Sequence, residues 1–152
     1  MVFGANADQF LASRELEAEV FGPASLVVAC KDAAQMKAVA EHLEGQLTAT
    51  LFVDDADVAL AQALLPVLER KAGRILANGY PTGVEVSHAM VHGGPFPATS
   101  NPASTSVGAT AIRRFLRPVC YQDLPDALLP DGVKRANPLG LTRMVDGTLS
   151  AA

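Results

Sequence analysis

Apolar residues in the first half of the chain form short runs separated by segments of helical spacing. The runs at 24–30, 47–53 and 74–78 are short and rich in Val, Leu, Ile, Thr and Ala, and Gly22-Pro23 bounds the first of them. Short apolar runs bounded by turn residues are typical of strands buried on both faces. The pattern therefore predicts three buried β-strands.

Two helices are predicted in the intervals between these strands. The first begins after Asp32, which can cap a helix, and ends at Gly45; the second begins at 54–55 and ends at Gly73. Pro66 inside the second predicts a kink or an earlier break. The alternation of strands and helices indicates an α/β fold, a three-layer βαβαβ arrangement with a parallel sheet covered by helices.

Glycine and proline concentrate in the second half. Of the 22 in the chain, 15 lie at 79–140. We therefore expect one partial domain over 1–152, with a regular βαβαβ part at 1–78 and a loop-rich part at 79–152. The loop-rich part has one predicted helix near 109–116.

Charge, hydropathy and cysteine content exclude several classes of function. The net charge is −4 without a basic cluster, so no nucleic-acid partner is expected. No apolar run is long enough to span a membrane, and Cys30 and Cys120 form neither a CxxC pair nor a disulfide framework, so the expected location is the cytoplasm. Hydrophobic residues reach 49% while charged residues are 18%, which indicates apolar surface that meets another surface.

The usual chemical motifs are missing, and the most metal-like cluster is weak. Neither GxGxxG nor GxxxxGK[ST] occurs. His88 and His92 would share one face of a helix, with Glu85 nearby, but prolines and glycines bracket the segment. We assign no metal ligand, and a small metal-dependent enzyme that uses His88 and His92 stays an alternative.

Two further segments carry candidate binding residues. Glu19 and Phe21 precede the first predicted strand at the i, i+2 spacing that shares one face of extended backbone. They could hold a ribose and pack against its base, or Phe21 could be core and Glu19 solvated. In 93–100, two glycines and two prolines flank Phe96, which either lines a pocket or is buried beneath a surface turn.

The ordered set of these segments resembles the C-terminal part of the catalytic domain of NAD(P)-dependent aldehyde dehydrogenases. The stretch 15–23 (ELEAEVFGP) is similar to the E-x-F-G-P segment of that family, and the Gly93-Gly94 loop and Arg113-Arg114-Phe115 follow in the family order. Within the family, GYPTGVEV, HGGPFPATS, RPVCYQDLP and NPLGLTRMVDG most resemble the 2,5-dioxovalerate dehydrogenases. Family membership would make the chain part of an oligomeric enzyme, expected to be a homo-oligomer.

The resemblance implies roles for three residues. Glu19 would accept hydrogen bonds from the nicotinamide ribose, Phe21 would pack near the nicotinamide, and Phe96 would lie in the aldehyde tunnel. The parent enzyme would oxidise an aldehyde, such as the dicarboxylic semialdehyde 2,5-dioxopentanoate, to a carboxylate with NAD or NADP. A Cys thiolate and a Glu-activated water perform that chemistry in the family.

The family's catalytic residues have no counterpart in this chain. The nucleophilic Cys, the general-base Glu and the Rossmann-like domain precede E-x-F-G-P in the family, whereas only 18 residues precede Glu19 here and both cysteines follow it. We therefore assign no catalytic residue and expect the isolated chain to be inactive, without tightly bound cofactor. The alternative from another class is a non-catalytic interaction module that self-associates through its apolar surface.

Overall fold

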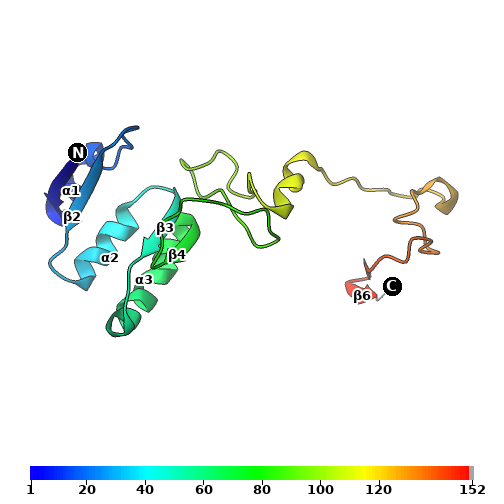
Figure 1. The fold of residues 1–152 in the computed structure, drawn as a ribbon. Helices are drawn as coiled ribbons and strands as arrows, with labels where there is room; N and C mark the ends of the chain where they lie inside the picture. The colour runs from blue at the N-terminus through cyan, green and yellow to red at the C-terminus, as the bar shows by residue number, and fades with distance from the viewer. Residues whose placement is uncertain (151–152) are drawn as a thin grey trace. The chain divides into compact units, whose positions relative to one another are not determined.

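The computed structural model describes residues 1–150 (Figure 1). The chain divides into two units, the first Met1–Leu116 and the second beginning at Arg117. The elements of the first unit are β1 (Val2–Asn6), α1 (Ala7–Ala12), η1 (Arg14–Leu16), β2 (Ser25–Ala29), α2 (Ala33–His42), β3 (Gln46–Leu51), η2 (Asp55–Asp57), α3 (Val58–Lys71), β4 (Ala72–Ala77) and η3 (Ala109–Phe115). Those of the second are η4 (Asp126–Leu128), β5 (Arg143–Val145) and β6 (Thr148–Ser150). Here η denotes a 3-10 helix.

The first unit is α/β, and its four strands form two separate parallel pairs. β1 pairs with β2, and β3 pairs with β4. The α/β class is confirmed, and strands form at the three predicted positions as β2, β3 and β4. The prediction that they are buried on both faces is wrong for residues 1–150, because most of their residues are half-buried or exposed. These strands do not form one sheet in 1–150, because β2 pairs with a strand at 2–6 that the sequence pattern did not predict. This N-terminal strand includes a glycine and is mostly exposed, so it lacks the apolar run of a buried strand.

The predicted helices begin at their aspartate caps. The Asp32 carboxylate accepts a hydrogen bond from Gln35 N at 2.7 Å, and α2 follows at once. The Asp54 carboxylate accepts one from Ala56 N at 2.8 Å at the start of η2, which leads into α3. Helix α3 is not broken at Pro66. Pro66 and Gln62, whose carbonyl loses its helical donor there, are both exposed, so water can satisfy that carbonyl.

The core of the first unit lies on one face of α3. Leu64, Val67 and Leu68 are buried and cluster with Ala40 of α2. Partly buried residues from both strands of the second sheet, Ala49 and Leu51 of β3 and Ile75 of β4, pack against this cluster together with Leu60. Helix α3 therefore joins α2 to the β3–β4 pair.

Asn78 fastens together the carboxyl ends of β3 and β4. Its backbone N–H donates to the Leu51 carbonyl at 2.9 Å, while its side-chain amide accepts from Val53 N at 2.8 Å and donates to Val53 O at 2.9 Å. Its φ of 50° lies in the left-handed region, which asparagine tolerates better than most residues.

The segment predicted as a helix near 109–116 forms the 3-10 helix η3. Gly108, with φ of 99°, precedes it without a side-chain cap, and Ile112 and Phe115 are exposed. A helix that buries no apolar face has little to stabilise regular α-helical geometry.

In the second unit, β5 and β6 form a hairpin whose turn residues Asp146 and Gly147 both have positive φ, as the tight two-residue hairpin turn requires.

Among residues 1–150, no helix combines the length and the apolar character needed to cross a membrane.

Candidate functional site

Segment 18–24, between η1 and β2, carries Glu19 and Phe21 on open surface. Phe21 is 93% exposed, so the alternative in which Phe21 belongs to the core is wrong. Glu19 is exposed, and its carboxylate takes part in no hydrogen bond or ion pair within the described residues. The segment therefore presents two free acceptor oxygens and an uncovered aromatic ring to a ligand.

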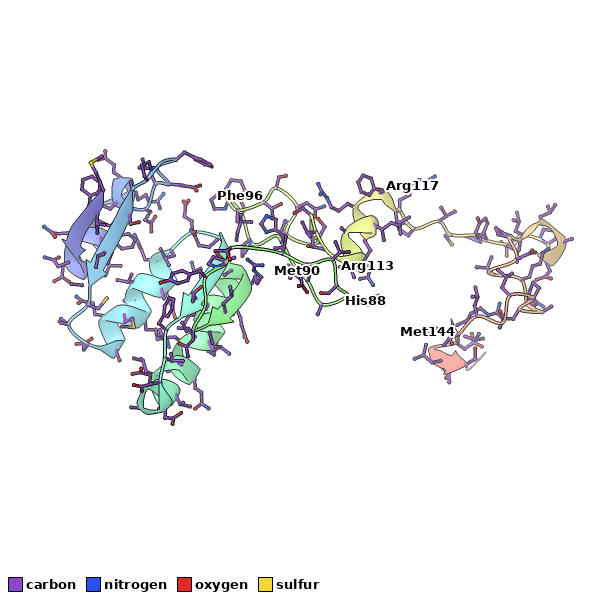
Figure 2. The ribbon with its side chains drawn as sticks, viewed as in Figure 1. His88, Met90, Phe96, Arg113, Arg117 and Met144 are labelled. Carbon is purple, nitrogen blue, oxygen red and sulfur yellow. The ribbon has the colours of Figure 1, made fainter. Side chains whose placement is uncertain are left out.

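Phe96 is also exposed, in a loop whose backbone is held tightly. The Phe96 ring is 78% exposed, so the alternative of a buried phenylalanine beneath a surface turn does not hold (Figure 2). The Phe96 carbonyl accepts a hydrogen bond from Gly45 N at 3.2 Å, and the Pro95 carbonyl accepts one from Ala98 N at 2.9 Å. The loop is anchored through its backbone, and the aromatic side chain stays available.

Three glycines allow this loop to lie against the first residues of β3 and β4. A Cβ on Gly73 would overlap the carbonyl oxygen of Gly93, and a Cβ on Gly94 would overlap that of Gln46. A Cβ on Gly45 would overlap the carbonyl oxygen of Pro95. The sequence pattern identified Gly45 and Gly73 only as helix stops. Their role in close backbone approach depends on residues far along the chain, so local spacing could not reveal it.

The structure does not join the two candidate segments through any hydrogen bond or ion pair among residues 1–150. Glu19 and Phe21 precede β2 in the first strand pair, whereas Phe96 is anchored at the amino ends of the second pair. The cofactor-binding and substrate-pocket roles of these residues stay predictions.

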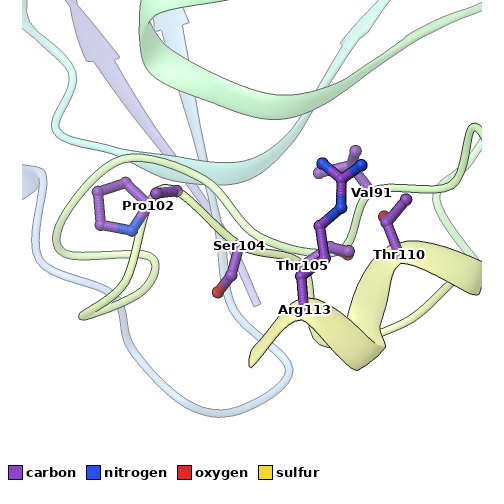
Figure 3. A pocket seen from close by; sticks show the side chains of 7 residues that line it. Val91, Pro102, Ser104, Thr105, Thr110 and Arg113 are labelled. Atoms are coloured by element: carbon purple, nitrogen blue, oxygen red, sulfur yellow. The ribbon is translucent and has the colours of Figure 1, made fainter. Parts of the chain in front are cut away.

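Two small cavities lie in the loop-rich part of the first unit. Arg113 lines one of them and Arg114 lines the other. One, of about 200 Å³, is lined by Val91, Ser104, Thr110 and Arg113 among others (Figure 3). The other, of about 230 Å³, is lined by Arg114 together with His92, Asn101 and several hydroxyl residues. Arg113 and Arg114 are adjacent in sequence, whereas the fold brings them to different cavities.

Two further arginines, Arg117 and Arg143, lie in the second unit. Arg143 donates to the backbone carbonyls of Lys134 at 2.6 Å and Arg135 at 3.3 Å, so it fastens its own unit. Arg117 is exposed (Figure 2).

His88 and His92 do not share a helical face, because residues 81–92 form no helix. His88 and Glu85 are exposed, while His92 is half-buried and its backbone N–H donates to Thr105 Oγ1 at 2.8 Å. Within the part of the chain that the structure describes, no group of three or more His, Cys, Asp or Glu side chains could hold a metal ion. The spacing that favoured a metal-dependent enzyme therefore has no geometric counterpart in these residues.

Both cysteines are free thiols. Cys30 is half-buried directly after β2, and Cys120 is exposed in the second unit.

Comparison with known proteins relates nearly the whole chain to two dehydrogenases. It is 66% identical over 146 residues to alpha-ketoglutaric semialdehyde dehydrogenase 2 of Azospirillum brasilense, covering 96% of this chain and 28% of that enzyme. It is 59% identical over 136 residues to alpha-ketoglutaric semialdehyde dehydrogenase of Acinetobacter baylyi, covering 90% of this chain and 26% of that enzyme. The chain thus spans about a quarter of the length of these relatives. No protein-family model matches it.

Proposed function

The chain is homologous, over nearly its whole length, to one part of the alpha-ketoglutaric semialdehyde dehydrogenases, and we propose that it supplies a part of the catalytic domain of such an aldehyde-oxidising enzyme. The observation that carries the proposal is 66% identity over 96% of the chain. The parent reaction converts an aldehyde and water to a carboxylate while NAD or NADP is reduced. Its substrate is proposed to be 2,5-dioxopentanoate or a similar dicarboxylic semialdehyde.

The exposed residues of segment 18–24 suit a nicotinamide nucleotide. When bound, this cofactor accepts the hydride that leaves the aldehyde carbon. The Glu19 carboxylate would accept hydrogen bonds from two ribose hydroxyls, because it has two acceptor oxygens and no partner among residues 1–150. The 93% exposed ring of Phe21 would cover one face of the adjacent base and exclude water from it.

Phe96 is proposed to line the aldehyde pocket. Its ring is uncovered while its backbone is fixed by Gly45, so the side chain can form an apolar wall at a constant position. This chain contributes binding and orientation. The nucleophile and the base of the reaction would come from the parts of the relatives that it does not match.

We therefore propose that the chain alone does not oxidise aldehydes. It matches only 28% and 26% of its relatives. Cys30 and Cys120 both follow Glu19, whereas the family resemblance implies a nucleophile that precedes it. The purified chain, incubated with 2,5-dioxopentanoate and either NAD or NADP, is expected to form no reduced cofactor by absorbance. Turnover by the purified chain would overturn this proposal.

A chimeric enzyme tests the assigned residues. In it, this chain replaces the matching 146 residues of the Azospirillum brasilense relative. The chimera is expected to be active. Glu19→Gln is expected to raise KM for the nicotinamide nucleotide about tenfold or more, because one acceptor oxygen becomes an NH2 donor and the remaining acceptor is no longer charged.

Glu15→Gln is the matched control for this variant, since Glu15 is exposed in the neighbouring turn. An unchanged KM for the cofactor in Glu19→Gln would remove Glu19 from the site. An inactive chimera that nevertheless folds would count against the shared function.

A second candidate function, a self-associating module, rests on the apolar surface of β1 and β2. Val2, Phe3 and Val27 are 75%, 53% and 57% exposed. Such side chains on a two-stranded sheet favour contact with another surface, and a homo-oligomeric parent is proposed on the same ground.

Sedimentation velocity distinguishes the two functions. A module would show a sedimentation coefficient that rises with concentration in the wild-type chain and falls in Phe3→Asp, while Asp8→Asn, at an exposed position of α1, leaves it unchanged. A concentration-independent monomer would exclude the self-associating module.

A further inference from the structure

A half-buried pair of an imidazole and a carboxylate lies directly before segment 18–24. Nε2 of His42, the last residue of α2, is 3.0 Å from Oε1 of Glu17, and the two side chains are 29% and 9% exposed. Neither atom has a hydrogen-bond partner among residues 1–150, so the contact is a close approach of an imidazole and a carboxylate, which is an ion pair when the ring carries a proton. Glu17 is the C-cap residue that directly follows η1.

The surroundings of His42 hold its ring in place. The Phe10 ring, only 3% exposed, meets the imidazole edge to face with centroids 5.8 Å apart. On the same two helices, Gln35 of α2 donates to the Asp8 carboxylate of α1 at 2.9 Å. Helix α1 is thereby fastened to α2, and the imidazole lies between Phe10 and Glu17.

The contact between Glu17 and His42 fixes the start of segment 18–24, and the pairing of β1 with β2 fixes its end. Upstream, Glu17 N donates to the Arg14 carbonyl at 3.2 Å, which closes η1. Downstream, Ser25 N donates to the Met1 carbonyl at 3.0 Å as β2 begins beside β1. The exposed side chains of Glu19 and Phe21 have little packing of their own, so their position depends on these two anchors.

We propose that the Glu17–His42 ion pair is a positioning device that clamps η1 to α2 and thereby places Glu19 and Phe21 for their ligand. The proposal rests on the proposed cofactor role of Glu19 and Phe21, although the clamp itself can be measured without cofactor. Loss of the His42 imidazole would leave the Glu17 carboxylate, whose side chain is 9% exposed, without its partner, and an unpaired charge shielded from water is unfavourable. The arrangement in which Glu17 contacts His42 is therefore favoured.

The test is amide hydrogen exchange by NMR on the full 152-residue chain without cofactor. Spectra are taken at about pH 6, where imidazoles are commonly protonated. The reporters are the amides of Glu17 and Ala24, which donate to the carbonyls of Arg14 and Gly22 at 3.2 and 2.8 Å. Glu17→Gln and His42→Gln are each expected to speed exchange at these two amides about tenfold or more, while the amides of α3 change little. Glu17→Gln should also shift the ring nitrogens of His42.

Glu15→Gln is the control, because it removes the same charge from an exposed position of the same 3-10 turn. It is expected to leave both the exchange rates and the His42 ring signals as they are. Uniform acceleration in α3 and segment 18–24 would show a general contribution to stability and would overturn the positioning role. So would unchanged exchange at Glu17 and Ala24.

The exchanged pair Glu17→His with His42→Glu keeps the proposal testable if the single variants unfold. It restores opposite charges at the same two positions and is expected to restore the exchange protection. Failure to restore it would overturn the ion-pair explanation.

In the chimera, the single variants are expected to raise KM for the nicotinamide nucleotide more than they lower kcat. If the variants speed amide exchange but leave KM for the nicotinamide nucleotide unchanged, the positioning role of the Glu17–His42 pair is supported and the proposed cofactor role of segment 18–24 is wrong. If exchange is unaffected, the clamp itself fails.

Discussion

The variant Gly73→Ala is expected to separate loop 93–96 from β4 and to destabilise the first unit by more than about 2 kcal/mol. The new Cβ would overlap the Gly93 carbonyl oxygen, and its next neighbours are also backbone atoms. Backbone cannot rotate aside as a flexible side chain can, so either the loop or the strand must move. Chemical denaturation of the purified chain measures the loss of stability, and NMR shifts at Gly93 and Phe96 report the displacement.

Gly83→Ala is the matched control, since a Cβ there meets nothing within 4 Å. It is expected to change the unfolding free energy by less than about 0.5 kcal/mol, as a surface substitution generally does. Equal effects of the two variants would show that the loop does not depend on close contact with Gly73. In the active chimera, Gly73→Ala should raise KM for the aldehyde because it moves the anchored Phe96.

Replacing Leu64 by alanine is expected to cost about 2–5 kcal/mol, the range for removing a buried leucine side chain. Leu64 is 6% exposed and lies between Ala40 of α2 and the residues of β3 and β4. A loss of this size approaches the whole stability of a small domain, so the helix–sheet contact would largely open. Urea unfolding followed by circular dichroism gives the change in free energy.

The neighbouring substitution Leu65→Ala provides the comparison. Leu65 is on the same helix but is 38% exposed, so it is expected to cost less than about 1 kcal/mol. Similar losses for the two leucines would place the core elsewhere than on the Leu64 face of α3.

The α/β class and the position of most elements followed from local pattern. The Asp32 cap, the apolar spacing of α3 and the runs that became β2, β3 and β4 act over a few residues, so sequence reveals them. The strand at 2–6 was missed because its exposed residues show no buried run. The division into two strand pairs was missed because pairing joins distant segments.

Some residues of the candidate site could likewise be found from the sequence, and others only from the fold. Glu19, Phe21 and Phe96 were found from motifs that lie within a few neighbouring residues. The fold then excluded a core position for Phe21 and a buried one for Phe96. Glu17 and His42 belong to different elements, and neither has a local motif that marks it, so the ion pair could not be anticipated.

By itself, the sequence determined where strands and helices begin, which residues resemble a dehydrogenase and which nucleotide motifs are missing. Those properties depend on neighbours along the chain. Only the tertiary structure decided that Gly73 must remain without a side chain, that Asn78 fastens β3 to β4 and that His42 meets Glu17. Each of these depends on contact between segments that are far apart in sequence, where short-range steric and electrostatic forces act only after folding.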